Sequence, residues 1–139
     1  MESRRVQAHR GGYDECSRYL FERNFICAPV VMLVRREVFA HVGRMNEAFR
    51  GAYDYDFVFR SLEAGYKIAF MDTASAVWRT HEGQGSRNIR QAKWAQIRIL
   101  WGFLCRRPDF IFKHPVTVIK KAVFALGGFI LKRTAFVVD

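Results

Sequence analysis

Residues 51–65 read GAYDYDFVFRSLEAG, and this stretch joins a helical pattern to a cluster of acids. Residues 54–64 predict a helix, because four apolar side chains repeat at helical spacing on one face: Tyr55, Val58, Phe59 and Leu62. Gly65 follows as the residue that ends the helix. Two carboxylates, Asp54 and Asp56, fall in the first turn of the predicted helix.

These two acids fit two different roles. Free backbone N–H groups and the helix dipole keep a carboxylate in a first turn ionised and fixed in direction, which suits a general base. The same residues also fit a helix cap at Asp54 and an i,i+4 ion pair between Asp56 and Arg60. Because acids are common in first helical turns, spacing alone favours the structural role.

The segments around this helix predict a mixture of helices and strands. Before it, residues 14–23 and 36–42 predict helices, and the β-branched run at 30–34 between them predicts a buried strand. After it, residues 66–71 and 75–79 predict two short strands. The expected fold class is therefore α/β, with short strands packed by helices and a basic helical tail behind them.

The tail begins near residue 87 and predicts two helices, at 87–105 and 116–132, separated by a break at Pro108. Its longest uncharged apolar run has ten residues, about half of the ~20 that a membrane-spanning helix needs. We therefore expect two domains, a front domain at 1–86 and a helical tail at 87–139.

Charge divides the chain in nearly the same place. Half of the 139 residues are hydrophobic, which argues against disorder. The formal charge of +10 indicates an anionic partner. Residues 1–83 hold 12 Lys or Arg against 11 Asp or Glu, whereas residues 84–139 hold 11 against 2. The basic character thus belongs to the tail.

The cysteines and the N-terminus indicate a reducing compartment. The three cysteines are Cys16, Cys27 and Cys105, an odd number without the C-x-x-C spacing of a zinc site, so no disulfide framework is expected. The first residues show no apolar stretch behind their charges, so no signal peptide is expected either. The expected location is the cytoplasm.

One face of the first tail helix combines arginine with tryptophan: Arg87, Arg90, Trp94, Arg98 and Trp101. The opposite, apolar face is expected to pack on the front domain: Ile89, Ala92, Leu100 and Phe103. Tryptophan between cations suits the headgroup level of an anionic membrane, and the inner face of the cell membrane is the expected place. A basic face that is simply exposed to solvent explains the same pattern nearly as well.

His81 stands at the end of a predicted strand, before a loop with two glycines. A histidine in that place could ligate a metal ion, with oxygen ligands supplied from elsewhere. A lone histidine is more often a surface or hydrogen-bonding residue, and no second ligand lies at a short spacing.

Three blocks in this order, over residues 24–88, resemble the acceptor-side half of a family 2 glycosyltransferase with the GT-A fold. The blocks are VVMLVRREVFAHVGRMNEAFR, GAYDYDFVFRSLEAGYKIAF and WRTHEGQGSRN. The family pattern places a strand and "RReVF" before an Asp-rich helix start, "eDyDfwlR". Tyr53 stands where that pattern has Glu, and Asn46 stands where it has the Asp of a "DE" pair.

The resemblance implies roles for named residues. It makes Asp54 the catalytic base, which deprotonates an acceptor hydroxyl as that oxygen attacks a nucleotide sugar, and Asp56 its supporting acid. It implies substrate-binding roles for Tyr53, Arg60, Arg79 and Arg87. It also implies that His81 reaches a divalent metal ion, Mg or Mn, or the diphosphate, and that residues 83–87 form a loop that closes over the donor.

The expected function is therefore the acceptor-side portion of an inverting, nucleotide-sugar-dependent glycosyltransferase. No nucleotide-binding βαβ half and no metal-binding D-x-D motif precede residue 24. The chain is therefore expected to be either a truncated enzyme or one that needs a separate N-terminal half as a partner. The other expected partners are a saccharide or lipid-linked acceptor and an anionic membrane. Two alternatives stay open: a basic nucleic-acid-binding module, which lacks a recognisable motif, and a non-catalytic interaction remnant.

Overall fold

The computed structural model describes residues 13–26, 29–69 and 89–134, and in the last helix it describes side chains as far as Ala125. The regular elements, in chain order, are α1 (Tyr13–Glu22), η1 (Pro29–Val31), α2 (Arg36–Val42), η2 (Glu47–Phe49), α3 (Tyr53–Glu63), α4 (Ile89–Arg106), α5 (Asp109–Lys113) and α6 (Pro115–Thr134), where η marks a 3-10 helix. The chain forms two compact units, Met1–Phe103 and Leu104–Asp139, whereas the sequence predicts a boundary after residue 86.

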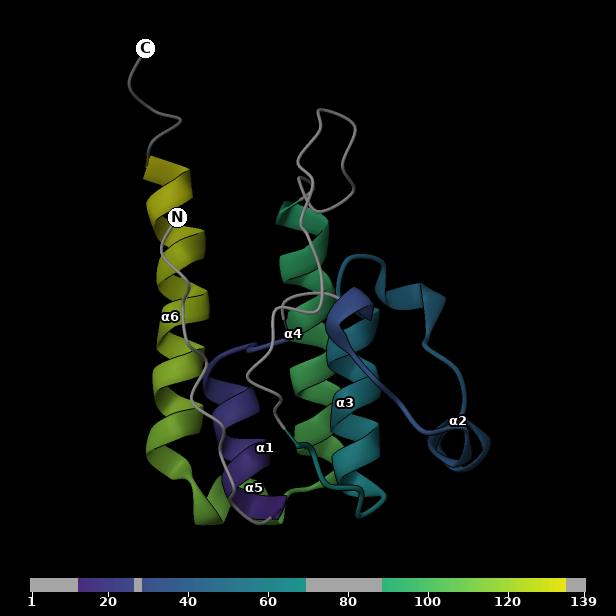
Figure 1. The fold of residues 1–139 in the computed structure, drawn as a ribbon. Helices are drawn as coiled ribbons and strands as arrows, with labels where there is room; N and C mark the ends of the chain where they lie inside the picture. Colours follow the sequence, from purple (N-terminus) through teal and green to yellow (C-terminus); the bar gives the residue numbers. More distant parts are fainter. Residues whose placement is uncertain (1–12, 27–28, 70–88, 135–139) are drawn as a thin grey trace, which may run out of the picture. The chain divides into compact units, whose positions relative to one another are not determined.

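Every regular element in the described ranges is a helix, so the predicted α/β fold class is wrong (Figure 1). Where a strand was predicted at 30–34, Pro29–Val31 form one 3-10 turn, and Met32 N donates to Pro29 O at 3.0 Å. A strand satisfies its backbone groups only beside another strand, and the described part of the chain offers none. The local β-propensity of this run is therefore insufficient.

The other two predicted strands are tested only in part. Residues 66–69 carry no regular structure, and the remainder of both strands lies outside the described residues. The helices are predicted far better, since residues 36–42 match α2 and residues 54–64 match α3 to within one residue. The predicted end of α3 is also confirmed, because Gly65 has a φ of 87°, a conformation that glycine adopts without strain.

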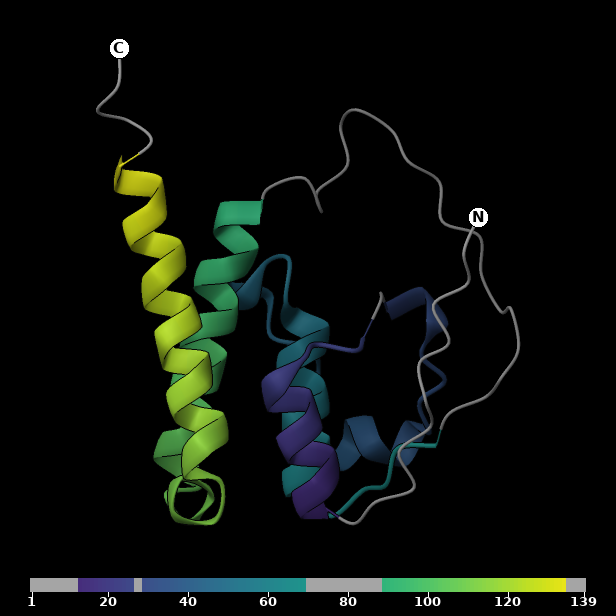
Figure 2. The ribbon, with the colours of Figure 1, turned by 90° about the vertical axis from the view of Figure 1, so that its left-hand side faces the viewer.

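Helix α3 forms the centre of the first unit. Its predicted apolar face is buried, and so are Phe57 and Ser61, so the helix is enclosed on most of its circumference. Helix α1 packs against α3, and Leu20 and Phe21 of α1 are buried (Figures 1 and 2 give two views of these helices). Two ring contacts extend this core to α4: Phe59 lies 4.6 Å from Phe103 and Phe21 lies 6.2 Å from Phe103, between ring centroids.

The buried face of α4 is made of four residues: Ala95, Ile99, Leu100 and Phe103. Leu100 and Phe103 agree with the predicted inner face, but Ile89 is exposed at the first turn, so that part of the prediction is wrong. The predicted outward positions Trp94 and Trp101 are exposed. The buried face of α4 is therefore rotated about the helix axis from the predicted one and includes Ala95 and Ile99.

The second unit contains α5 and α6. Arg107 donates two hydrogen bonds of 2.9 Å to the carboxylate of Asp109, and this contact lowers the pKa of Asp109 to about 2. His114 joins the two helices, since its N–H donates to Phe110 O and its carbonyl accepts from Val118 N. Among the described residues, no helix is both long enough and apolar enough to cross a membrane.

Candidate functional site

Asp54 lies in the first turn of α3, one residue after its N-terminus. The N-cap is Ala52, whose side chain cannot cap the helix, and Asp54 instead offers its carboxylate to a backbone N–H of the first turn. Its Oδ1 accepts a hydrogen bond from Tyr55 N at 2.8 Å. The carboxylate is therefore held in a fixed direction by the backbone, as the sequence predicts for a first-turn acid.

The surroundings of Asp54 disfavour its charge. Partial burial raises the pKa of this carboxyl above its ordinary value, while hydrogen bonds from the Tyr55 and Asp54 N–H groups oppose the shift. Asp54 makes no ion pair with any residue in the described ranges. A half-buried carboxylate with a raised pKa and no cation beside it has the properties of a proton acceptor.

Asp56 has the opposite environment. It is buried, and its Oδ2 accepts a hydrogen bond of 2.8 Å from Nε of Arg60 one helical turn later. The predicted i,i+4 ion pair is thus confirmed. Successive residues of a helix are rotated by about 100°, so Asp54 and Asp56 leave the helix on nearly opposite sides.

Arg60 connects three elements through one guanidinium group. Besides its bond to Asp56, it donates to Val42 O at 2.7 Å and to Arg44 O at 2.9 Å. Its guanidinium carbon also lies 5.6 Å from the centroid of the Phe57 ring. Arg60 therefore binds the C-terminal end of α2 and the following loop to α3.

This connection could not be predicted from spacing, because the two carbonyls lie 18 and 16 residues before Arg60. The only available signal was the i,i+4 pair with Asp56. The substrate-binding role that the resemblance implies for Arg60 stays a prediction, and in the structure all three of its nitrogens already have acceptors.

The remaining predicted site residues separate into two groups. Tyr53 adjoins Asp54 at the N-terminus of α3 and is about one third exposed. Arg79, His81 and Arg87 lie outside the described residues, as does the predicted loop at 83–87. The structure thus places the predicted base and Tyr53 together.

The divalent metal ion implied by the resemblance has no complete site in the described ranges. No group of three or more His, Cys, Asp or Glu side chains there is arranged to hold an ion. His81 falls outside these ranges, so its assignment as a metal ligand stays a prediction. We therefore assign no step of the chemistry to a metal ion.

The resemblance to family 2 glycosyltransferases rests on the motifs of this sequence. Searches of protein-family models, of curated proteins and of solved structures found nothing that matches the chain.

Proposed function

We propose that this chain is the acceptor-side portion of an inverting glycosyltransferase that uses a nucleotide sugar, with Asp54 as the general base. The observation that carries the proposal is the state of the Asp54 carboxylate, which is aimed by a backbone N–H, half withdrawn from water and not neutralised by a described cation. The ordered sequence blocks around it add independent support.

In the proposed reaction, a hydroxyl oxygen of the acceptor attacks the anomeric carbon of the donor sugar. The hydroxyl proton passes to Asp54 while the bond from the anomeric carbon to the diphosphate oxygen breaks. The nucleotide diphosphate leaves with that electron pair, and the configuration at the anomeric carbon inverts. A base with a raised pKa holds the accepted proton better than an ordinary aspartate does, which favours this transfer.

Asp56 and Arg60 have a positioning role in this proposal. Their ion pair, together with the bonds from Arg60 to Val42 O and Arg44 O, fixes α3 against α2. A base must lie within hydrogen-bond reach of the proton that it takes, so the orientation of the first turn matters for the rate.

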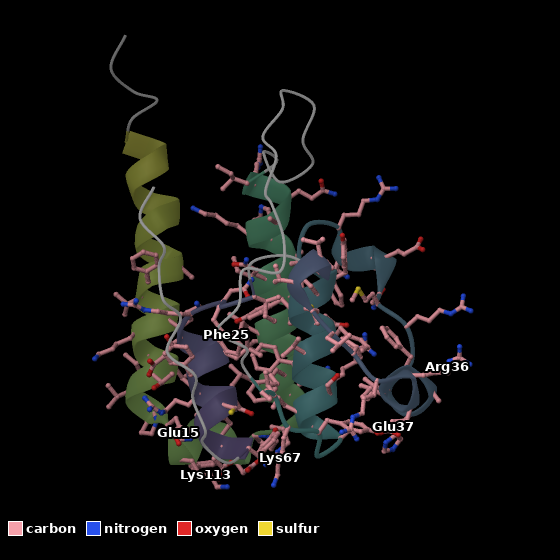
Figure 3. All side chains as sticks on the ribbon, in the orientation of Figure 1. Glu15, Phe25, Arg36, Glu37, Lys67 and Lys113 are labelled. Atoms are coloured by element: carbon pink, nitrogen blue, oxygen red, sulfur yellow. The ribbon has the colours of Figure 1, made fainter. Side chains whose placement is uncertain are left out.

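The test compares Asp54→Asn with Glu37→Gln, both exchanges of an acid for its amide. Glu37 is an exposed residue of α2 at the outer side of the molecule (Figure 3), and its ion pair with Arg35 is solvent-exposed. Each variant replaces the wild-type chain in its own cells, and extracts with membranes receive radiolabelled UDP-glucose, UDP-galactose, UDP-N-acetylglucosamine or GDP-mannose. Using the native extract supplies any second protein that the reaction needs.

We expect Asp54→Asn to lower sugar transfer at least ~100-fold at unchanged protein level, because general bases contribute factors of this size. Glu37→Gln is expected to retain the wild-type rate. Wild-type transfer by Asp54→Asn would show that the chain acts without this base, as an interaction remnant would. Failure of the wild-type extract to transfer any of the four sugars would count against the function itself.

For location, we propose peripheral attachment to the inner face of an anionic membrane. Three exposed apolar residues of α6 follow one another at spacings of three and four: Val116, Ile119 and Val123. Phe112 of the preceding helix α5 is exposed as well. Lys113 and Lys120, both exposed, flank this apolar row. A helix with apolar and cationic faces of this kind suits the boundary between headgroups and acyl chains. Membrane-bound acceptors would be within reach of such a protein.

A further inference from the structure

An open cleft of about 430 Å³ lies between the loop around η2 and the first half of α4, within the first unit. Three arginines line it, Arg50 from the loop and Arg90 and Arg98 from the helix. Gln91 and the half-exposed indole of Trp94 add a polar amide and a flat apolar surface. None of the lining residues is acidic, so the cleft is strongly cationic.

The three arginines have no acidic partner among the residues that the structure describes. Helix α4 contains no Asp or Glu over its 18 residues. The guanidinium carbon of Arg98 lies 5.4 Å from the centroid of the Phe49 ring, a contact that orients the group without neutralising it. Three guanidinium cations therefore face this cleft.

The two walls of the cleft are held together by a close approach of backbone. Gly51 has a φ of 80°, and a Cβ built there would lie only 3.3 Å from Cβ of Ala92 on α4. The loop is braced from within, since Asn46 Oδ1 accepts from Ala48 N at 3.0 Å and Phe49 O accepts from Ala52 N at 2.8 Å. Arg50, which precedes Gly51, therefore lies in the same cleft as Arg90 and Arg98 of α4.

We propose that this cleft binds a phosphate or diphosphate group carried by a molecule with an apolar portion. Guanidinium groups match phosphate oxygens in pairs, and three of them suit a group with two or more negative charges better than a single carboxylate. The face of Trp94 receives the apolar portion. The ligand is either a free phosphate ester or the headgroup of a lipid, and the site stands whether or not the chain transfers sugars.

The first experiment titrates the purified chain with inorganic pyrophosphate by calorimetry at constant ionic strength. Arg50→Gln and Arg90→Gln remove one cleft cation each, and both arginines are exposed residues. Arg36→Gln is the matched control, since Arg36 lies on α2 and points away from the molecule (Figure 3). All four proteins have their thermal unfolding recorded first.

We expect saturable binding that each cleft substitution weakens about tenfold, while Arg36→Gln stays within about twofold of the wild type. Equal weakening by all three substitutions would mean attraction to diffuse charge and would overturn the proposal. Binding without saturation would overturn it as well.

A second experiment separates the two sources of phosphate. Vesicles of phosphatidic acid and of phosphatidylglycerol, matched in charge, present a phosphate monoester and a diester. If lipid is the source, phosphatidic acid is preferred and Arg50→Gln and Arg90→Gln reduce vesicle binding more than Arg36→Gln does. If the variants bind vesicles equally but lose pyrophosphate, the ligand is a free phosphate ester.

Discussion

Asp54 and Asp56 stand two positions apart on α3, yet the ionised carboxylate of Asp56 stabilises the fold and that of Asp54 destabilises it. Asp56 is buried against a guanidinium group that it neutralises. Asp54 is partly buried without such a partner in the described ranges, and its pKa is raised. A residue kept in an unfavourable ionised state is a feature of functional sites, where stability and activity compete.

The first prediction concerns Asp54→Asn. The folded chain binds a proton at Asp54 more tightly than the unfolded chain, so the ionised group costs stability at neutral pH. We expect the variant to be at least as stable as the wild type at pH 7, since Asn keeps the Oδ1 acceptor for Tyr55 N. Its advantage should fade as the pH falls through the raised pKa of Asp54. Urea unfolding of both proteins from pH 7 to pH 4 measures this difference, and a marked loss of stability at pH 7 would contradict it.

The second prediction is that Asp56→Asn destabilises the fold. The substitution removes the charge that compensates Arg60, whose side chain is three-quarters buried. We expect the free energy of unfolding to fall by about 2 kcal/mol. Chemical denaturation at pH 7 provides the measurement. If Asp54→Asn and Asp56→Asn gave equal stabilities, the assignment of different roles to the two acids would fail.

The sequence anticipates much of this residue-scale picture. Placement of Asp54 in a first turn and pairing of Asp56 with Arg60 both follow from local spacing. The raised pKa of Asp54 does not, because its cause is burial, which spacing does not reveal. The bonds of Arg60 to Val42 O and Arg44 O do not either, because they join residues 18 and 16 positions apart. Helical periodicity indicates which acids share a turn but not what covers them.

At the scale of elements, one buried hydrogen bond connects α1 to α3. The hydroxyl of Tyr55 donates to Leu20 O at 2.9 Å, and both residues are almost fully buried. Burial also raises the pKa of Tyr55, so the hydroxyl stays protonated and able to donate. The contact fixes the register between the two helices as well as the distance between them.

The third prediction is that Tyr55→Phe destabilises the chain although it preserves the ring. The change leaves a buried carbonyl without its donor, at a cost of about 1–2 kcal/mol. The ring contact of residue 55 with Phe59, 5.0 Å between centroids, is expected to survive. Thermal unfolding measures the loss, and an unchanged midpoint would show that solvent replaces the bond.

The helices were predictable and the strand at 30–34 was not, for a physical reason. An amphipathic helix satisfies its own backbone and needs only a surface to cover, so residues 36–42 and 54–64 carry their signal locally. A strand needs a neighbour that supplies backbone partners. Without such a neighbour, the run at 30–34 follows Pro29, a residue that favours the first turn of a helix, and it begins as the 3-10 turn η1.

At the scale of the whole molecule, three of the 23 basic residues meet in one cleft, where they can bind an anion. Sequence spacing alone brings Arg90, Trp94 and Arg98 onto one face, which predicted an outward basic stripe. The structure turns these residues toward the loop that carries Arg50, and they line a cleft. Arg50 could not be placed there from the sequence, because 40 positions separate it from Arg90.

The fourth prediction follows from the exposed apolar row of α6. We expect the chain to float with vesicles of phosphatidylglycerol at low salt and to be largely released at about 0.5 M salt, where the Debye length falls to a few ångströms. Val116→Ser with Ile119→Ser should reduce flotation at low salt, since the apolar contact is lost. Absence of flotation by the wild type would contradict peripheral attachment.

The backbone around η1 has a consequence for handling the protein. Val30, Val31 and Leu33 are exposed within an uncharged run of high β-propensity, the kind of window that pairs with its copy on another molecule. Two features oppose this pairing. Pro29, before the run, has no N–H to donate to a neighbouring strand, and the charges of Arg35 and Arg36, behind it, repel those of a second copy. Preparations are therefore expected to stay dispersed at low ionic strength and to self-associate when salt screens these arginines.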